Sequence, residues 1–222
     1  MDPNFKADVV FLVDSSFSVS RPNFQLEKDF VKSMGDTLNV EPGKSRGSVV
    51  SFATTPRRHF GFNDYSTKSQ FERLVDSTPY LGQYRRMDKA IEEAGRVLKQ
   101  ARDGVPKVVV LLTAGRDVRG GEVLKEAVKP LQRDGVKVFI VAIGDQPDIP
   151  ALTGAVEQPE DVFRVPGFKQ LPDHGVPAGN HVASRAGKER VDFFLSGIVV
   201  LTEMTRCGLL TKKRVLVLFR SG

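Results

Sequence analysis

The feature that most restricts the fold of this chain is a set of short apolar runs, rich in β-branched residues, that alternate with segments of helical periodicity. The runs at 8–14, 107–113 and 136–143 have the composition of strands buried on both faces of a parallel sheet. Between them apolar residues recur at helical spacing, as they do after Ser20 and Pro22, a hydroxyl cap followed by a first-turn proline. This alternation predicts βαβ units and a parallel sheet.

The same signals assign the remaining elements. Strands are expected at 8–14, 47–53, 59–62, 107–113, 136–143 and 161–165, and helices at 20–38, 66–76, 87–101, 122–133 and 149–156. The run at 59–62 follows a turn directly after a strand and is expected to be a short antiparallel edge strand. A last helix is expected to begin at 167–171.

The net charge of +6 is concentrated near the C-terminus. Residues 166–222 hold nine Lys or Arg and four Asp or Glu, whereas the first 165 residues hold 24 and 23. The part with strand and helix signals is therefore close to neutral, which argues against a surface that binds nucleic acid.

A change of character after Leu171 divides the chain into two parts. We expect one α/β domain at 6–171 and a basic C-terminal extension at 172–222, where Pro and Gly interrupt the last helix. The extension holds apolar runs at 191–201 and 215–219. Three interpretations stay open for it: a poorly packed extension, a non-native tail from a splice or reading-frame change, or a small partner-binding segment.

Signals for export and membrane insertion are lacking in the sequence. No apolar run approaches the roughly 18 to 20 residues of a membrane-spanning helix. The first residues lack the basic-then-apolar layout of a signal peptide, so a secreted protein would be represented here by a fragment or without its leader. The lone Cys207 cannot form an internal disulfide.

Three oxygen donors follow the first apolar run at alternate positions, namely Asp14, Ser16 and Ser18. In open parallel sheets, ligands bind at the carboxyl ends of the strands. A carboxylate with two hydroxyls suits a small hard cation such as Mg²⁺. A turn of this composition also caps a following helix without binding anything, so the motif alone leaves both interpretations open.

The Asp-x-Ser-x-Ser motif at 14–18 and the order of the elements resemble the von Willebrand factor A domain family. The segment 135–144 looks most like modules of the collagen VI and matrilin type. The resemblance covers residues 6–171 and implies a Rossmann-like, doubly wound, mostly parallel α/β sheet with one short antiparallel edge strand and helices on both faces. In this family the motif begins a metal-ion-dependent adhesion site, which a threonine and an aspartate from two later loops complete.

Two of the five donors of that site are missing from this chain. When the sequences are aligned on Gly82, Arg85 occupies the threonine position and Ala114 occupies the aspartate position. A guanidinium can neutralise a carboxylate bidentately, so we expect Arg85 to stand in for the metal beside Asp14, with no cofactor required.

Alternatives to this assignment stay open. Asp14, Ser16 and Ser18 could still hold Mg²⁺ or Mn²⁺ weakly, with water in place of the lost groups. An alignment shifted by one residue would turn Tyr84 or Arg86 toward the site. Asp117 is the nearest spare carboxylate and would have to reach across Arg116.

The resemblance implies a non-enzymatic adhesion module, secreted into the extracellular matrix. Its partners would be matrix or cell-surface proteins such as collagens, with no nucleic acid and no membrane span. The ligand-binding face would contain Asp14, Ser18, Arg85 and Arg116. In collagen VI-type proteins many copies have lost metal donors and serve assembly, which fits the losses seen here.

Two other functions remain as alternatives. An intracellular scaffold domain of the same fold fits the absent leader and the single cysteine. A nucleotide-binding Rossmann enzyme needs a phosphate-binding turn after its first strand, where this chain has Asp14, whose charge repels phosphate. The histidines at 59, 174 and 181 are scattered, and no serine lies in a G-x-S-x-G motif, so no catalytic residue is predicted.

Overall fold

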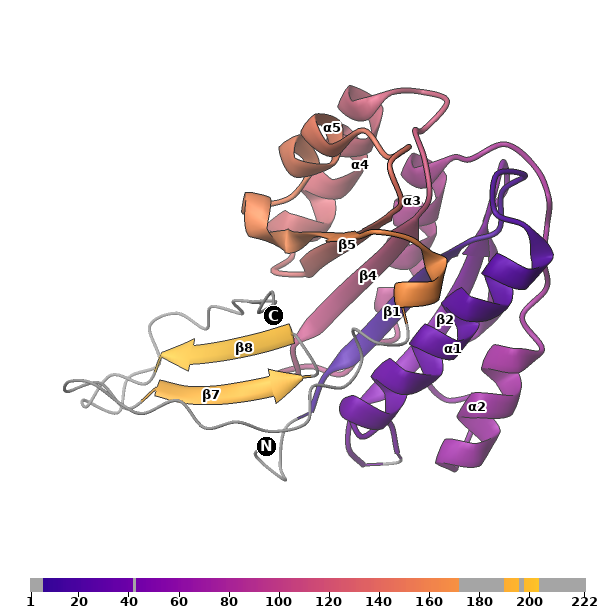
Figure 1. Cartoon of the computed structure of the whole chain (residues 1–222). Helices are drawn as coiled ribbons and strands as arrows, with labels where there is room; N and C mark the ends of the chain where they lie inside the picture. The colour runs from indigo at the N-terminus through magenta and orange to yellow at the C-terminus, as the bar shows by residue number, and fades with distance from the viewer. Residues whose placement is uncertain (1–5, 42, 172–189, 196–197, 204–222) are drawn as a thin grey trace.

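The computed structural model describes residues 6–41, 43–171, 190–195 and 198–203 (Figure 1). Its strands are β1 (Asp8–Asp14), β2 (Arg46–Phe52), β3 (Arg57–Phe60), β4 (Lys107–Thr113), β5 (Lys137–Ile143), β6 (Val162–Val165), β7 (Arg190–Leu195) and β8 (Ile198–Glu203). Its helices are α1 (Arg21–Thr37), α2 (Lys68–Asp76), α3 (Met87–Leu98), α4 (Gly121–Arg133) and α5 (Ile149–Ala155), with 3₁₀ turns η1 (Pro159–Asp161) and η2 (Phe168–Gln170).

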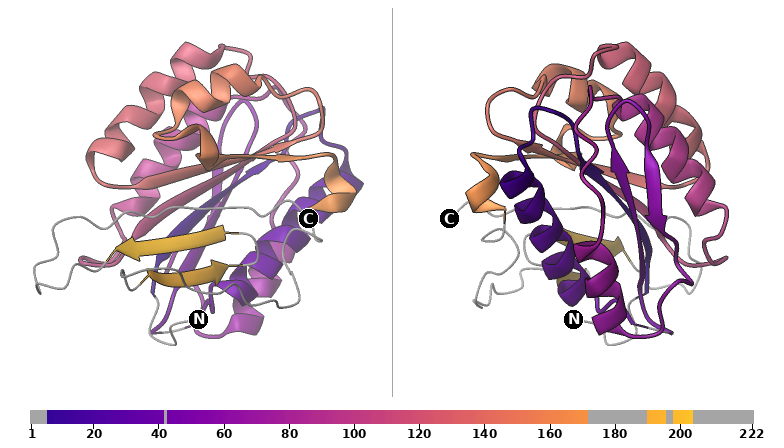
Figure 2. Two further views of the ribbon diagram at one scale, coloured as in Figure 1. Left: turned by 60° about the vertical axis from the view of Figure 1, so that its left-hand side comes forward. Right: turned by 90° about the vertical axis from the view of Figure 1, so that its right-hand side faces the viewer.

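Six of the strands form one sheet, in the order β3-β2-β1-β4-β5-β6. All neighbouring strands in it run parallel except β2 and β3, which are antiparallel. Helix α1 lies on one face of the sheet, and α3 and α4 lie on the other (Figure 2). The predicted fold class, a doubly wound α/β sheet with one antiparallel edge strand, is confirmed.

The sheet divides the apolar core into two clusters, and β1 contributes to both because its side chains alternate between the faces. Phe11 and Val13 pack into the cluster under α1, whereas Val10 and Leu12 pack into the cluster under α3. All seven residues of β1 are buried, as expected for a central parallel strand.

Two expected elements differ from the structure. The edge strand β3 lies at Arg57–Phe60 rather than 59–62, because two arginines form its first half. Their exposed side chains suit an edge but not an apolar pattern. The last helix expected from 167 is only the turn η2, and the chain beyond Leu171 is not described again until β7.

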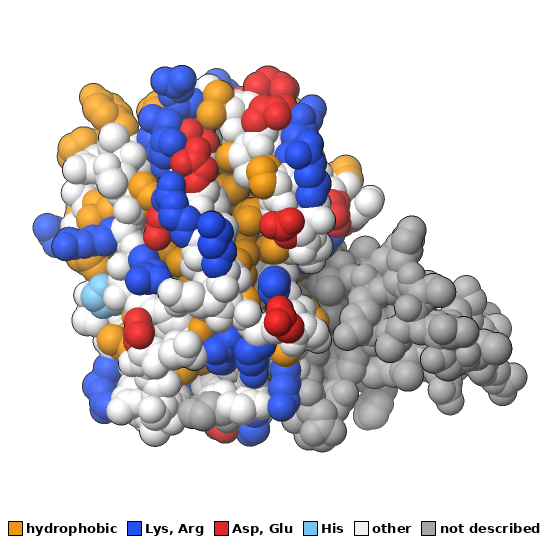
Figure 3. Space-filling view, turned by 180° about the vertical axis from the view of Figure 1, so that it is seen from behind, with side chains coloured by type: hydrophobic (Ala, Val, Ile, Leu, Met, Phe, Trp, Pro, Cys, Tyr) orange, Lys and Arg blue, Asp and Glu red, His pale blue; other side chains and the backbone are white. Residues whose placement is uncertain are grey.

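Part of the C-terminal extension forms the antiparallel pair β7–β8, across the apolar run expected at 191–201. The run at 215–219 and Cys207 lie outside the described residues. No helix in the described part of the chain is long and apolar enough to cross a membrane. Across the face seen from behind, Lys and Arg side chains are interspersed with Asp and Glu (Figure 3).

The carboxyl ends of β1 and β4 lie side by side because these parallel strands are direct neighbours. Three loops meet at this edge: residues 14–20 after β1, residues 80–86 before α3, and residues 114–120 after β4. These three loops are referred to below as the carboxyl edge.

Candidate functional site

The first loop of the carboxyl edge is organised around the buried carboxylate of Asp14. Its Oδ1 accepts a hydrogen bond from the backbone N–H of Ser16 at 3.0 Å, so the carboxylate closes the turn that follows β1. The hydroxyls of Ser16 and Ser18 lie 3.2 Å apart and share a hydrogen bond. All three oxygen donors predicted from the motif therefore lie together.

The second loop is joined to the first by backbone hydrogen bonds. The N–H of Phe17 donates to the carbonyl of Gln83 at 2.8 Å, and the N–H of Gly82 donates to the carbonyl of Ser15 at 2.8 Å. Gly82 has a φ of +63°, a conformation that a side chain would strain. This pairing brings the next residues, including Arg85, over Asp14.

Arg85 reaches into the centre of the site, where it is only 6% exposed. Its Nε donates to Asp14 Oδ2 at 2.5 Å, its Nη2 donates to Ser18 Oγ at 2.5 Å, and its Nη1 donates to the carbonyl of Arg116 at 3.1 Å. Of the guanidinium nitrogens, Nε bonds to Asp14, and the Ser18 hydroxyl accepts from Nη2. One side chain thus bonds to residues of the first and third loops.

The neighbours of Arg85 do not face the site, so the alignment shifted by one residue is excluded. Tyr84 is 70% exposed. Arg86 turns to Asp88 in the first turn of α3, with Nε and Nη2 bonds of 2.8 and 2.7 Å.

The third loop completes the surroundings of Asp14 without supplying a carboxylate. The N–H of Ala114 and the hydroxyl of Thr113 donate to Asp14 Oδ2 at 3.2 and 3.4 Å. Gly115 leaves space for the arginine, since a Cβ at this position would lie 2.5 Å from Arg85 Nη1. With the Arg85 bond, Asp14 Oδ2 has three donors.

Asp117, the spare carboxylate noted in the sequence, is used elsewhere. It accepts hydrogen bonds from the N–H of Met87, where α3 begins without a side-chain cap of its own, and from the N–H of Arg119 at 2.7 Å. Burial raises the pKa of Asp117. Its position fixes the third loop against the start of α3.

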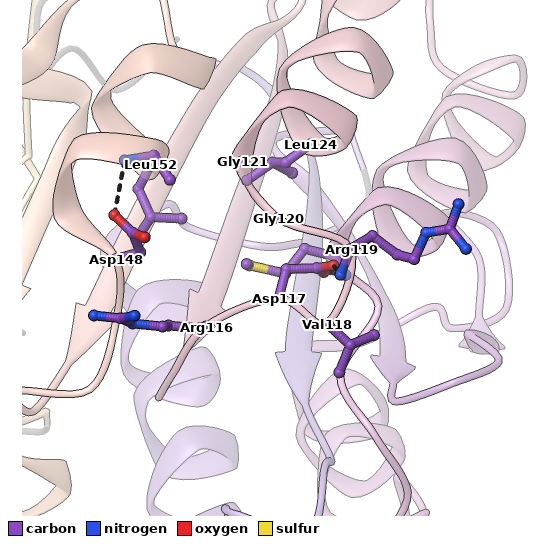
Figure 4. A pocket seen from close by; sticks show the side chains of 11 residues that line it. Arg116, Asp117, Val118, Arg119, Gly120, Gly121, Leu124, Asp148 and Leu152 are labelled. Atoms are coloured by element: carbon purple, nitrogen blue, oxygen red, sulfur yellow. Dashed lines mark hydrogen bonds between the residues drawn. The ribbon is translucent and has the colours of Figure 1, made fainter.

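A depression of about 390 Å³ lies beside these loops, between the third loop and the starts of α4 and α5. Arg116 and Asp148 lie on one side of it and Val118 and Arg119 on the other, with the two arginines pointing in opposite directions (Figure 4). Asp148 caps α5 by accepting from the N–H of Ala151 at 3.1 Å.

Sequence reasoning missed Glu27, which is fully buried in α1 behind the site. Its Oε2 accepts from the N–H of Asp14 at 2.9 Å, and its Oε1 has no partner among the described residues. Burial, and next the charge of Asp14, raise the pKa of Glu27 well above its ordinary value. The spacing of Glu27 could have predicted its burial. It lies three residues from both Phe24 and Phe30, which lie on the apolar side of the helix.

The carboxyl edge presents hydroxyl, aromatic and guanidinium groups to solvent. Within the part of the chain that the structure describes, no group of three or more His, Cys, Asp or Glu residues could hold a metal ion. His59, the one described histidine, lies on β3 and contacts Ser77. The edge instead combines a neutralised carboxylate, exposed hydroxyl and aromatic groups, and arginines.

The comparisons with known proteins agree on the fold and the family. The family model "von Willebrand factor type A domain" matches residues 8–174. The mouse collagen alpha-4(VI) chain is 32% identical over 166 residues, which is 71% of this chain and 7% of that protein. Human matrilin-1 is 30% identical over 142 residues, 62% of this chain and 28% of that protein.

Among solved structures, proximal thread matrix protein 1 of the mussel byssus, with a zinc-occupied MIDAS motif, superposes with a TM-score of 0.69 at 28% identity. The match covers 78% of this chain and 44% of that one. The chain thus spans less than half the length of each of these three relatives.

Proposed function

The chain belongs to the von Willebrand factor type A domain family, and we propose that it is a non-enzymatic protein-binding module of the extracellular matrix whose carboxyl edge works without a metal ion. The observation that carries the proposal is the position of Arg85, which bonds to Asp14 and Ser18 together. These are two of the three donors that the adhesion motif retains.

The residues present do not fit a divalent cation. A cation bound by Asp14 and Ser18 would meet the guanidinium that already donates to both oxygens, and two positive charges would share one buried site. The carboxylate that would add negative charge is absent, since Ala114 offers only its N–H. Gly115 leaves room for the arginine head rather than for a metal ligand.

The guanidinium supplies in permanent form what a cation would supply on binding. It offsets the charge of Asp14 and links the three loops, because its three nitrogens bond to residues of the first and third loops. Since a buried carboxylate without a partner is costly, this pair keeps the edge folded at any cation concentration.

The extracellular setting is supported by the relatives, because collagen VI chains and matrilins are extracellular matrix proteins. We infer that the domain is secreted as part of a longer protein and binds matrix or cell-surface proteins, with collagens as the first candidates. The face would contain Asp14, Ser18, Arg85 and Arg116, of which Ser18 and Arg116 are exposed.

Surface plasmon resonance on immobilised collagens, in EDTA and in Mg²⁺, tests this function. We expect equal binding in both buffers and its loss in Phe17→Asp, which places a charge on the exposed part of the carboxyl edge. Gln100→Asp is the matched control, because Gln100 is exposed beyond the far end of α3. Binding that requires Mg²⁺, or that both variants retain, would contradict the proposal.

A further inference from the structure

Large exposed apolar side chains in the described part of the chain are confined to the carboxyl edge. They are Phe17, Tyr84 and Val118, which are 66%, 70% and 55% exposed and come from the three different loops. Phe17 and Tyr84 pack edge to face, with ring centroids 5.9 Å apart. Exposed apolar groups that gather in one place mark contact surfaces, and aromatic residues with arginine are typical of interface centres.

Free positive charge lies next to this apolar group. Arg116 and Arg119 are exposed, and neither side chain forms an ion pair with any residue that the structure describes. The nearby carboxylates of Asp117 and Asp148 are instead occupied by backbone N–H groups at helix starts. Exposed acids on this side of the sheet include Asp145, after β5, and Glu122, in the first turn of α4.

The depression beside the third loop adds a place for a side chain. Its lining includes the buried apolar residues Met87, Leu124 and Leu152. Arg116 and Val118 lie on opposite sides of it (Figure 4). An apolar group that enters it would therefore lie next to a guanidinium.

From these observations we propose that the carboxyl edge binds an acidic protein segment that presents a bulky apolar side chain. This inference rests on the proposed function and names the chemistry of its partner. The apolar side chain packs on the Phe17–Tyr84 pair or enters the depression beyond Val118, and carboxylates of the segment pair with Arg116 and Arg119. Because Arg85 is already bonded to Asp14, the partner's charge is read by the exposed arginines and not by the central site.

The test uses phage-displayed random dodecapeptides, selected on the immobilised full chain in EDTA at low salt. We expect a consensus that combines Asp or Glu with a large apolar residue. The corresponding synthetic peptide should lose roughly tenfold or more in affinity to Phe17→Ala/Tyr84→Ala, as hot-spot aromatics do. Arg116→Gln should weaken binding and reduce its dependence on salt, because it removes one charge contact.

Arg133→Gln is the matched control, since Arg133 is an exposed arginine at the far end of α4 and should leave the affinity unchanged. No enrichment, a consensus without acidic or apolar residues, or equal affinity for all variants would overturn the inference. If the chain binds matrix proteins in EDTA but gives one of these results, only the inference about the partner fails. If matrix binding requires Mg²⁺, the proposed function fails whatever the peptides show.

Discussion

Two buried aspartates at opposite ends of β1 both pair with arginine, yet the number and the origin of their arginine partners differ. Asp8, at the start of the strand, is bonded by Arg46 from β2 at 2.6 Å and by Arg102, beyond α3, at 2.6 Å. Asp14, at the end of the strand, is bonded by Arg85 from a loop at 2.5 Å. Both carboxylates are fully buried.

The partners of the two carboxylates explain the difference. Burial raises the pKa of Asp8, but the hydrogen bonds from Arg46 and Arg102 outweigh it, so its pKa lies below the ordinary value. These two cations fix β1 against β2 and the chain after α3. Asp14 has a single guanidinium, aided by a hydroxyl and backbone N–H groups, at the carboxyl edge. The same kind of ion pair thus joins neighbouring strands at one end of β1 and the loops of the carboxyl edge at the other.

Removing the structural carboxylate should have the largest effect. Asp8→Ala leaves Arg46 and Arg102 without their shared counter-charge, and we expect about 3 kcal/mol less free energy of unfolding in urea titrations. Asp145→Ala, at an exposed acid, should change it by less than about 0.5 kcal/mol. Equal losses in both variants would show that the Asp8 cluster contributes nothing special.

Removing one arginine from each end should separate the two sites by their response to cations. Arg85→Ala and Arg102→Ala should each cost about 2 kcal/mol in EDTA, because each withdraws charge-assisted bonds from a buried carboxylate. Millimolar Mg²⁺ should restore part of the loss only in Arg85→Ala, where Asp14, Ser16 and Ser18 are then free to accept a cation. Thermal melts measure both effects, and equal responses to Mg²⁺ would remove the distinction.

A methyl group added beside Arg85 should have a smaller effect. In Gly115→Ala the new Cβ meets Arg85 Nη1 at 2.5 Å, so the guanidinium must move, and we expect a loss of about 1 to 2 kcal/mol by calorimetry. Gly154→Ala, inside α5 with nothing within 4 Å of the new Cβ, should be neutral or slightly stabilising. A destabilised Gly154→Ala with an unaffected Gly115→Ala would contradict the packing described here.

The effect expected of Glu27 is a pH dependence of the free energy of unfolding rather than a loss of fixed size. Above about pH 4.3 Glu27 ionises in the unfolded chain, whereas the folded chain keeps its proton because its pKa is raised. The free energy of unfolding should therefore fall as pH rises toward the folded-state pKa, by up to about 1.4 kcal/mol per pH unit for this group. Glu27→Gln should flatten that slope above about pH 4.3, and Glu122→Gln, at an exposed site, should not. Parallel curves for all three proteins would contradict a protonated Glu27.

Much of the fold could be predicted because its signals are local. Expected and observed bounds coincide for β1 and β4, since each is an apolar run that packs on both faces of the sheet. The edge strand β3 was misplaced because its arginines face water, and edge strands tolerate such residues. The sequence predicts the start of a helix at 167–171, where the structure has the 3₁₀ turn η2. A short run of apolar residues does not distinguish a 3₁₀ turn from the start of a helix.

The site could be predicted only in part from the sequence, because much of it depends on contacts between residues that are distant in the chain. Asp14, Ser16 and Ser18 follow one strand and could be grouped by spacing, and Arg85 could be placed by its alignment with the family motif. The bond between Arg85 and Ser18 spans 67 residues and has no local signal. The same holds for the capping of α3 by Asp117, 30 residues away, and for the approach of Glu27 to Asp14.

The most direct test of the central claim is a thermal melt of EDTA-washed protein with and without millimolar Mg²⁺ or Mn²⁺, beside the double variant Arg85→Thr/Ala114→Asp. We predict no shift for the parent chain, because Arg85 occupies the donors. The double variant should be stabilised on cation binding, by about 2.7 kcal/mol at a hundredfold excess over its dissociation constant. A cation-dependent shift in the parent chain would contradict the claim that an arginine has taken the place of the metal.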